Sequence, residues 1–199
     1  NAYNLFLAYG IGRELGLSEP EALTGLSLIK PPKGRMQLLH GANGITGIVD
    51  YAHSADALMH ALQTIQAANK HEGQVLVVMG CGGDRDTAKR PEMLRTALSY
   101  AHQVVITADN PRSEDPAAIA RDMEAGVSEE QMSRVLTILD RKQAIRTATR
   151  LAGKGAIILV AGKGHECHQE VNGVYYPFDD QAVLAQSLSI DHHQTNPSA

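Results

Sequence analysis

The 199-residue chain is poor in cysteine, and basic residues are not in excess. Its two cysteines, Cys81 and Cys167, are too few for a disulfide framework, which favours a reducing compartment. The formal net charge of −4 gives no basic surface for nucleic acid. No apolar run approaches the roughly 20 residues that span a bilayer, and no secretory signal pattern is recognisable. We therefore expect a cytoplasmic protein with neither a nucleic-acid nor a membrane partner.

Familiar catalytic signatures are missing as well. The sequence has no G-x-x-x-x-G-K-[ST] phosphate loop, and its glycine-rich stretch GCGGDRD does not match G-x-G-x-x-G. No Ser-His-Asp or Cys-His nucleophile set stands out. The chain begins at Asn1 inside a helical pattern, without an initiator Met, so we expect it to be a segment of a longer protein.

The chain does contain a regular alternation of apolar runs and helical patterns. Two short helices are predicted first, one over 2–16 and one capped by Ser18 and Glu21, followed by a Pro/Gly-rich linker at 29–37. Beyond it, strands are predicted at 45–50, 74–80, 103–108, 134–139 and 156–162, with helices at 54–69, from about Pro91, at 115–127 and at 140–152. A hairpin is predicted around Asn172-Gly173. Apolar strands that alternate with helices indicate an α/β fold with a doubly wound, mostly parallel sheet.

Polar clusters follow four of the predicted strands. They are DYAH at 50–53, GCGGDRD at 80–86, DNPR at 109–112 and GKGHE at 162–166. In an open parallel sheet, ligands bind beyond the carboxyl ends of the strands. The four clusters therefore predict one shared ligand site.

The DNPR cluster suits a zwitterionic ligand. Pro111 biases Asn110 toward an extended backbone, so that the neighbouring side chains can project into a cleft. Arg112 can form a two-pronged contact with a carboxylate, while Asp109 and the Asn110 carbonyl can accept from an ammonium group. An Asx-Pro turn with an exposed arginine is an equally good interpretation of the spacing.

The other clusters are more ambiguous. GCGGDRD can hold an anion at a helix N-terminus, or it is a tight turn with a solvated Arg85. Asp50 can bind a ribose diol with His53 nearby, or the two belong to a strand-end turn and a helix cap. In GKGHE, Glu166 fits an ammonium group, and Lys163 is structural or solvated. Zinc at His165, Cys167 and His168 is disfavoured, because adjacent ligands rarely all point at one ion.

Taken together, NAYN, GRM, DYAHSAD, GCGGDRD…KRP, DNPR, AGKGHE and FDD, in this order, closely resemble a Mur ligase. The DNPR version goes with meso-diaminopimelate rather than lysine in this family. The resemblance implies a Rossmann-like C-terminal amino-acid domain at 38–190, preceded by a helical remnant of the central ATP domain at 1–30. Residues 31–37 would be the linker or hinge and 191–199 a flexible tail.

The resemblance also implies functional residues. The residues that would bind meso-diaminopimelate are Arg85, Asp109, Asn110, Arg112, Gly162 and Glu166. The residues that would line the nucleotide are Asn4, Arg35, Asp50 and His53. No catalytic residue and no metal ligand is expected in this segment. ATP, Mg²⁺ and the UDP-N-acetylmuramoyl dipeptide would be held mainly by domains outside it, so the segment alone is predicted to be inactive.

Three alternatives stay open. They are a lysine-adding ligase, another Mur-type ligase such as the tripeptide-recycling enzyme, and a stand-alone module that binds an amino acid or nucleotide. Arg112 argues against lysine, because a sequestered guanidinium without a partner carboxylate would disfavour it by about 2–4 kcal/mol.

Overall fold

The computed structural model describes residues 2–29 and 32–194, with side chains for 4–29 and 32–189. The chain divides into two compact units, Asn1–Pro32 and Lys33–Ala199, which are described separately. None of the described helices is both long and apolar enough to cross a membrane.

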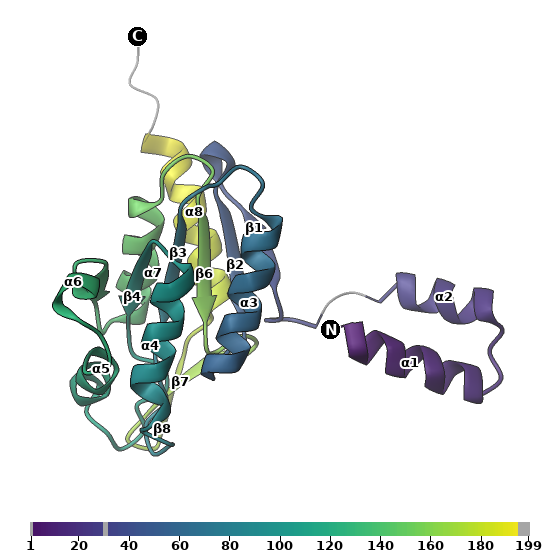
Figure 1. The fold of residues 1–199 in the computed structure, drawn as a ribbon, viewed down its shortest axis with the longest axis horizontal. Helices are drawn as coiled ribbons and strands as arrows, with labels where there is room; N and C mark the ends of the chain where they lie inside the picture. Colours follow the sequence, from purple (N-terminus) through teal and green to yellow (C-terminus); the bar gives the residue numbers. More distant parts are fainter. Residues whose placement is uncertain (1, 30–31, 195–199) are drawn as a thin grey trace, which may run out of the picture. The chain divides into compact units, whose positions relative to one another are not determined.

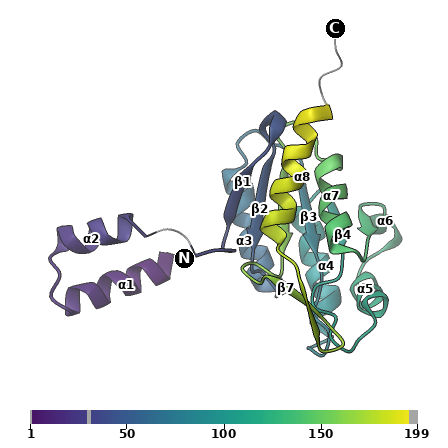
Figure 2. The same ribbon diagram turned by 180° about the vertical axis from the view of Figure 1, so that it is seen from behind.

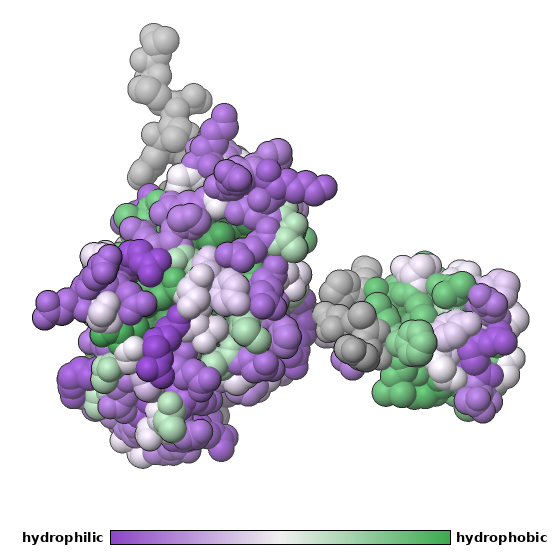
Figure 3. All heavy atoms as spheres, viewed as in Figure 1, coloured by the Kyte–Doolittle hydropathy of each residue, from purple (hydrophilic) through white to green (hydrophobic). Residues whose placement is uncertain are grey.

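The first unit is a pair of helices, α1 (Ala2–Glu14) and α2 (Glu19–Ser27). Ser18 is the N-cap of α2, and its backbone N–H donates to the Glu21 carboxylate at 2.8 Å, as the capping pattern predicted. Of the side chains described in this unit, only Ala22 is buried. The pair leaves large apolar side chains exposed: Leu5, Phe6, Leu7, Ile11, Leu15, Leu17, Leu23, Leu28 and Ile29. Figure 3 shows hydrophobic surface, in green, over much of the visible face of this unit.

The second unit is built on a six-stranded sheet (Figure 1). In spatial order the strands are β1 (Gln37–His40), β2 (Thr46–Asp50), β6 (Ile157–Ala161), β3 (Val75–Met79), β4 (Gln103–Ile106) and β5 (Val135–Thr137). All neighbouring pairs are parallel except β1 with β2. Every residue of β3 is buried, as expected for a strand covered on both faces.

Helices cover both faces of this sheet. One apolar cluster joins the sheet to α3 (Ala55–Ala68), α4 (Lys89–Tyr100) and α5 (Pro116–Glu124). A second cluster joins the opposite face to α7 (Arg141–Leu151) and α8 (Asp180–Gln194), which lie nearest the viewer in Figure 2. The predicted α/β fold with a doubly wound, mostly parallel sheet is confirmed.

Several elements differ from the sequence prediction. The antiparallel edge strand β1, the short helices η1 (Ala42–Gly44) and α6 (Glu129–Met132), and all of α8 were not expected. Helix α4 begins at Lys89, so that Pro91 is its third residue rather than its first. Helix α8 runs through Gln194 and thus into the segment predicted as a tail, of which residues 195–199 lie outside the described part.

A separate hairpin lies beyond the carboxyl end of β6. It consists of β7 (His168–Val171) and β8 (Val174–Pro177), joined by Asn172 and Gly173 with φ of 51° and 75°. Positive φ at both central residues is the type I′ arrangement that an Asn-Gly pair favours, so this prediction is confirmed.

Candidate functional site

The four polar clusters meet at one edge of the sheet. Their strands, β2, β6, β3 and β4, are consecutive neighbours and parallel, so their carboxyl ends lie side by side. A cavity of about 330 Å³ opens there. It is lined by Tyr51, His53, Gly80, Cys81, Gly82, Arg85, Asp86, Lys89, Asp109, Asn110, Arg112, Gly162 and Glu166. All six residues predicted to bind the amino acid are in its wall.

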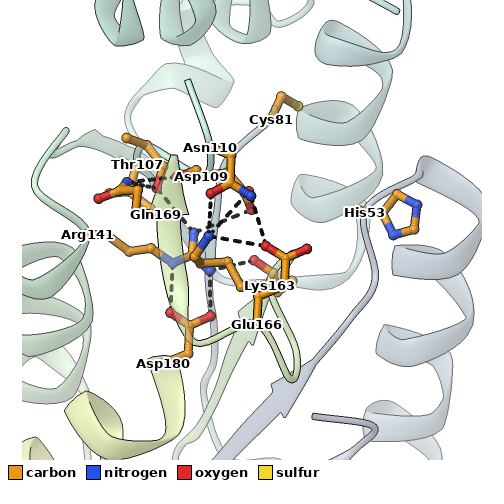
Figure 4. A network of polar contacts seen from close by, with 12 residues as sticks. His53, Cys81, Thr107, Asp109, Asn110, Arg141, Lys163, Glu166, Gln169 and Asp180 are labelled. Carbon is orange, nitrogen blue, oxygen red and sulfur yellow. Dashed lines mark hydrogen bonds and ion pairs between the residues drawn. The ribbon is translucent and has the colours of Figure 1, made fainter. Parts of the chain in front are cut away.

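Asp109 is the most enclosed acid in this wall. Its carboxylate is buried, with Arg141 Nη1 and Lys163 Nζ each 3.9 Å away (Figure 4). Burial raises the pKa of Asp109, and the attraction of Arg141 and Lys163 offsets part of that effect. An ammonium group placed beside Asp109 would stabilise its ionised form further.

Asn110, Lys163 and Glu166 form a connected polar group (Figure 4). Lys163 is fully buried, and its Nζ donates to Asn110 Oδ1 at 2.7 Å. The other end of the amide, Nδ2, donates to Glu166 Oε2 at 2.8 Å. Burial lowers the pKa of Lys163, while Asp109 and Glu166 counteract that shift. Lys163 therefore fixes the orientation of the Asn110 amide, and a solvated Lys163 is the wrong interpretation.

Arg141 and Asp180 support the site from behind, and sequence reasoning missed both. Arg141 Nε and Nη2 donate to Asp180 Oδ1 and Oδ2 at 2.7 and 2.8 Å, and both side chains are fully buried. Arg141 Nη2 also donates to the Ala161 carbonyl at 2.9 Å. Burial by itself lowers the pKa of Arg141, but the attraction and hydrogen bonds of Asp180 outweigh it and leave the pKa raised. The second Asp of FDD, quoted only as a family motif, was the one available signal.

Arg112 is held on two sides. Its Nε lies 3.1 Å from Glu170 Oε2, and its Nη1 donates to the Gly83 carbonyl at 2.7 Å. The side chain is only 23% exposed, so an exposed arginine in an Asx-Pro turn is wrong. Two of the five guanidinium donors have these partners, and the other three can serve a ligand carboxylate. The expectation that Arg112 would lack a partner when lysine is the ligand needs correction, because Glu170 already neutralises part of its charge.

Arg85 and Gly162 complete the wall. The Arg85 side chain is exposed at the cavity. Gly162 has φ of 116°, and a Cβ at this position would collide with Asp109 Oδ2. Glycine is therefore required where the backbone approaches the Asp109 carboxylate.

The residues predicted to line a nucleotide are more scattered. His53 lines the cavity, and Arg35 lies 4.9 Å above the ring of Tyr51, another lining residue. The Asp50 carboxylate is buried and accepts from the Met36 and Ala52 N–H groups at 2.7 and 2.9 Å, and Asp50 is not among the lining residues. Asn4 is exposed on α1, in the first unit.

A metal centre receives no support within the described ranges. No group of three or more His, Cys, Asp or Glu side chains there is arranged to hold a metal ion. His165, Cys167 and His168 therefore do not form such a group.

Relatives of known name match almost the whole chain. A UDP-N-acetylmuramoyl-L-alanyl-D-glutamate–2,6-diaminopimelate ligase from Bacteroides thetaiotaomicron is 47% identical over 186 residues, 94% of this chain and 39% of the relative. The enzyme of the same name from Geobacillus kaustophilus is 45% identical over 188 residues, 94% of this chain and 38% of the relative. The chain thus spans about two fifths of the length of these relatives.

Solved structures and a family model agree with this match. A structure of a ligase of that same name superposes with a TM-score of 0.74 at 40% identity, covering 98% of this chain and 39% of that one. A structure of a UDP-N-acetylmuramate–alanine ligase from Thermotoga maritima superposes with a TM-score of 0.62 at 15% identity. The match covers 98% of this chain and 38% of the ligase, and it supports the fold alone. The family model described as "Mur ligase, glutamate ligase domain" matches residues 34–164. The chain therefore belongs to the Mur ligase family.

Proposed function

We propose that the protein containing this chain is an ATP-dependent amide ligase. It adds meso-diaminopimelate to UDP-N-acetylmuramoyl-L-alanyl-D-glutamate, a step of peptidoglycan synthesis in the cytoplasm. The second unit of the chain binds and orients the amino acid. The observation that carries the proposal is the meeting of Arg85, Arg112, Asp109 and Glu166 in the wall of one cavity.

The charge pattern of this cavity fits a diamino dicarboxylate. Arg85 and Arg112 offer guanidinium donors for carboxylates, and Asp109 and Glu166 offer acceptors for ammonium groups. Four buried residues, Asp109, Asp180, Arg141 and Lys163, and the partly exposed Glu166 together contain three acids and two bases. One added ammonium group would therefore balance their charge. The relatives named for diaminopimelate addition support the same ligand class.

The contribution of this chain to the reaction is orientation. In the proposed reaction, the substrate carboxylate takes a phosphoryl group from ATP, and the amine of diaminopimelate displaces phosphate to form the amide. Asp109 and Glu166 would hold ammonium groups of the amino acid and the arginines its carboxylates, so that its reacting amine is presented at a fixed position. Such positioning lowers the entropic part of the barrier.

In this proposal, ATP and Mg²⁺ are bound mainly by other parts of the protein, and this chain contributes only a few contacts to the nucleotide. The described residues include no group of three or more His, Cys, Asp or Glu side chains placed to hold a metal ion, and we assign Mg²⁺ mainly to the domains outside this chain. Asn4, Arg35, Asp50 and His53 are the candidates for contact with the nucleotide. Two solved structures of similar fold are folylpolyglutamate synthases. One, at 20% identity, was solved with ADP and AMPPCP, and the other, at 23% identity, with Mn and AMPPNP. The exposed apolar side chains of the first unit fit a remnant of a larger ATP-binding domain.

Selectivity against lysine rests on Arg112. Lysine lacks the distal carboxylate that would occupy the three remaining guanidinium donors. Because Glu170 stays beside Arg112, the disadvantage of lysine should be at the lower end of about 2–4 kcal/mol. We expect a preference of about 30-fold or more for meso-diaminopimelate.

A coupled assay tests the proposal on the full-length protein that contains this chain. Phosphate release is measured with ATP, Mg²⁺, the UDP-linked dipeptide and either meso-diaminopimelate or lysine. Arg112→Lys should raise the KM for diaminopimelate by at least about tenfold, because Lys cannot form the bidentate contact. Arg121→Lys, at an exposed side chain of α5, is the matched control and should leave this KM unchanged. Phosphate release that depends on lysine but not on diaminopimelate would refute the assignment.

A further inference from the structure

Two loops that carry proposed ligand-binding residues, 80–86 and 109–116, pack against each other beside the cavity. The Gly83 N–H donates to the Asn110 carbonyl at 2.9 Å, and a Cβ at Gly83 would collide with the Pro111 carbonyl oxygen. The first loop carries Arg85 and the second carries Arg112. The relative position of the loops therefore sets the spacing of the two guanidinium groups.

Glu114 joins these loops through its side chain. Its Oε1 accepts from the Asp84 N–H at 2.6 Å and from Arg90 Nη2 at 2.8 Å. Arg90, on α4, is 1% exposed, and the same Nη2 lies 3.4 Å from the Gly82 carbonyl. One carboxylate thus binds the backbone of the first loop and a buried cation behind it.

The residues beside Glu114 reinforce the junction. Ser113 donates through its hydroxyl to Asp84 Oδ1 at 2.6 Å and through its N–H to Oδ2 at 3.2 Å. Asp84 has φ of 53° and Arg112 has φ of 51°, both in the left-handed region that non-glycine residues rarely adopt. Such conformations persist only where surrounding contacts fix them, and the contacts of Glu114 and Ser113 fix Asp84, the neighbour of Arg85.

We propose that Glu114 is a positioning residue of the amino-acid site, which acts by holding loop 80–86 in register with loop 109–116. It is not in the cavity wall, so it acts through Arg85 and Arg112 rather than on the ligand. The inference rests on the proposed function for the identity of the ligand. The junction itself rests on the contacts of Glu114, Asp84 and Arg90.

Asp122 provides a matched control. Its Oδ2 accepts from Arg90 Nη1 at 2.8 Å, the same length as the contact of Glu114 with Nη2. Asp122 lies on α5, and its described contact is with Arg90 rather than with loop 80–86. Removing either acid takes one counter-ion from Arg90, but only the loss of Glu114 frees the Asp84 N–H.

The experiment compares Glu114→Ala with Asp122→Ala in the full-length protein that contains this chain. Hydrogen exchange of residues 82–86 should accelerate in Glu114→Ala and not in Asp122→Ala. The KM for meso-diaminopimelate should rise by about tenfold or more in Glu114→Ala, since a hydrogen bond to a charged group is lost, while the KM for ATP stays within about twofold. Glu114→Gln, whose amide oxygen can still accept from both donors but gives Arg90 no negative charge, should be intermediate.

Two results overturn the proposal. One is unchanged exchange and KM in Glu114→Ala, and the other is an equal effect of Asp122→Ala, which would mean that only the charge balance of Arg90 matters. Failure of the proposed function looks different, because the unaltered protein would then show no dependence on meso-diaminopimelate. In that case the exchange of residues 82–86 still decides whether Glu114 holds the loops together.

Discussion

The buried pair of Arg141 and Asp180 gives the sharpest test of how the site is supported. Asp180→Asn leaves the fully buried Arg141 guanidinium without its counter-ion, and the remaining ion-pair partner among the described residues is Asp109 at 3.9 Å. Removing one partner of a buried ion pair typically destabilises a protein by about 3–5 kcal/mol. For a chain of this length, about 2–4 °C of Tm per kcal/mol corresponds to a fall of roughly 6–20 °C.

The assay is urea and thermal unfolding of this chain followed by circular dichroism. Arg141→Met should cost about as much as Asp180→Asn, because it leaves the carboxylate buried and unpaired. The double change Arg141→Met with Asp180→Leu should recover most of the stability, because no buried charge of the pair remains. Arg121→Met, at a guanidinium 68% exposed, should change the free energy of unfolding by less than about 0.5 kcal/mol.

The same variants separate stability from ligand binding. The double variant lacks the cation near Asp109 and the donor to the Ala161 carbonyl, so its affinity for meso-diaminopimelate should stay low even though the fold is restored. A loss below about 1 kcal/mol in both single variants would refute the reasoning. So would full ligand affinity in the double variant, because Arg141 would then have no part in placing Asp109.

Two further changes test the cavity wall, and a third tests the hairpin. Because burial raises the folded-state pKa of Asp109 above 3.8, its contribution to stability falls as the pH rises from about 3.8 through that higher pKa. Asp109→Asn should therefore equal or exceed the parent in stability at neutral pH and flatten this pH dependence in urea unfolding. It should still abolish amino-acid binding. A large loss of stability at neutral pH would contradict the expected direction of the pH dependence. Gly162→Ala, at φ of 116°, should lose about 1–3 kcal/mol in thermal unfolding and weaken amino-acid binding, and a neutral result would mean that the backbone there can shift. Gly173→Ala, at φ of 75° in the hairpin, should cost about 1 kcal/mol without a direct effect on the cavity, which calorimetric titration of the amino acid can check.

Much of the fold follows from local sequence patterns. The five parallel strands were predicted because each is a short apolar run bounded by polar or turn residues, and Asn172-Gly173 predicted the hairpin through its turn chemistry. The strand-end rule then placed the polar clusters at one edge, because parallel strands bring their carboxyl ends together. The chemistry of the DNPR and GKGHE clusters suggested Asp109, Asn110, Arg112 and Glu166 as ligand contacts, and the resemblance to Mur ligases added Arg85 and Gly162 to the set.

Other elements depend on contacts between distant residues. The edge strand β1 exists because it pairs with β2, and α8 covers one face of the sheet through Leu184 and Leu188. Neither segment has an apolar pattern strong enough to be recognised in isolation. Packing against the sheet, rather than local propensity, decides their structure.

The site shows the same division. The sequence by itself determined the α/β fold and which loops carry Asp109, Asn110 and Arg112. Only the tertiary structure decided that Lys163 is buried against Asn110, that Arg141 pairs with Asp180 39 residues away, and that Glu170 and Gly83 hold Arg112. The physical reason is that a side chain's charge and hydrogen bonds are fixed by neighbours in space, whereas periodicity and turn chemistry act only between neighbours along the chain.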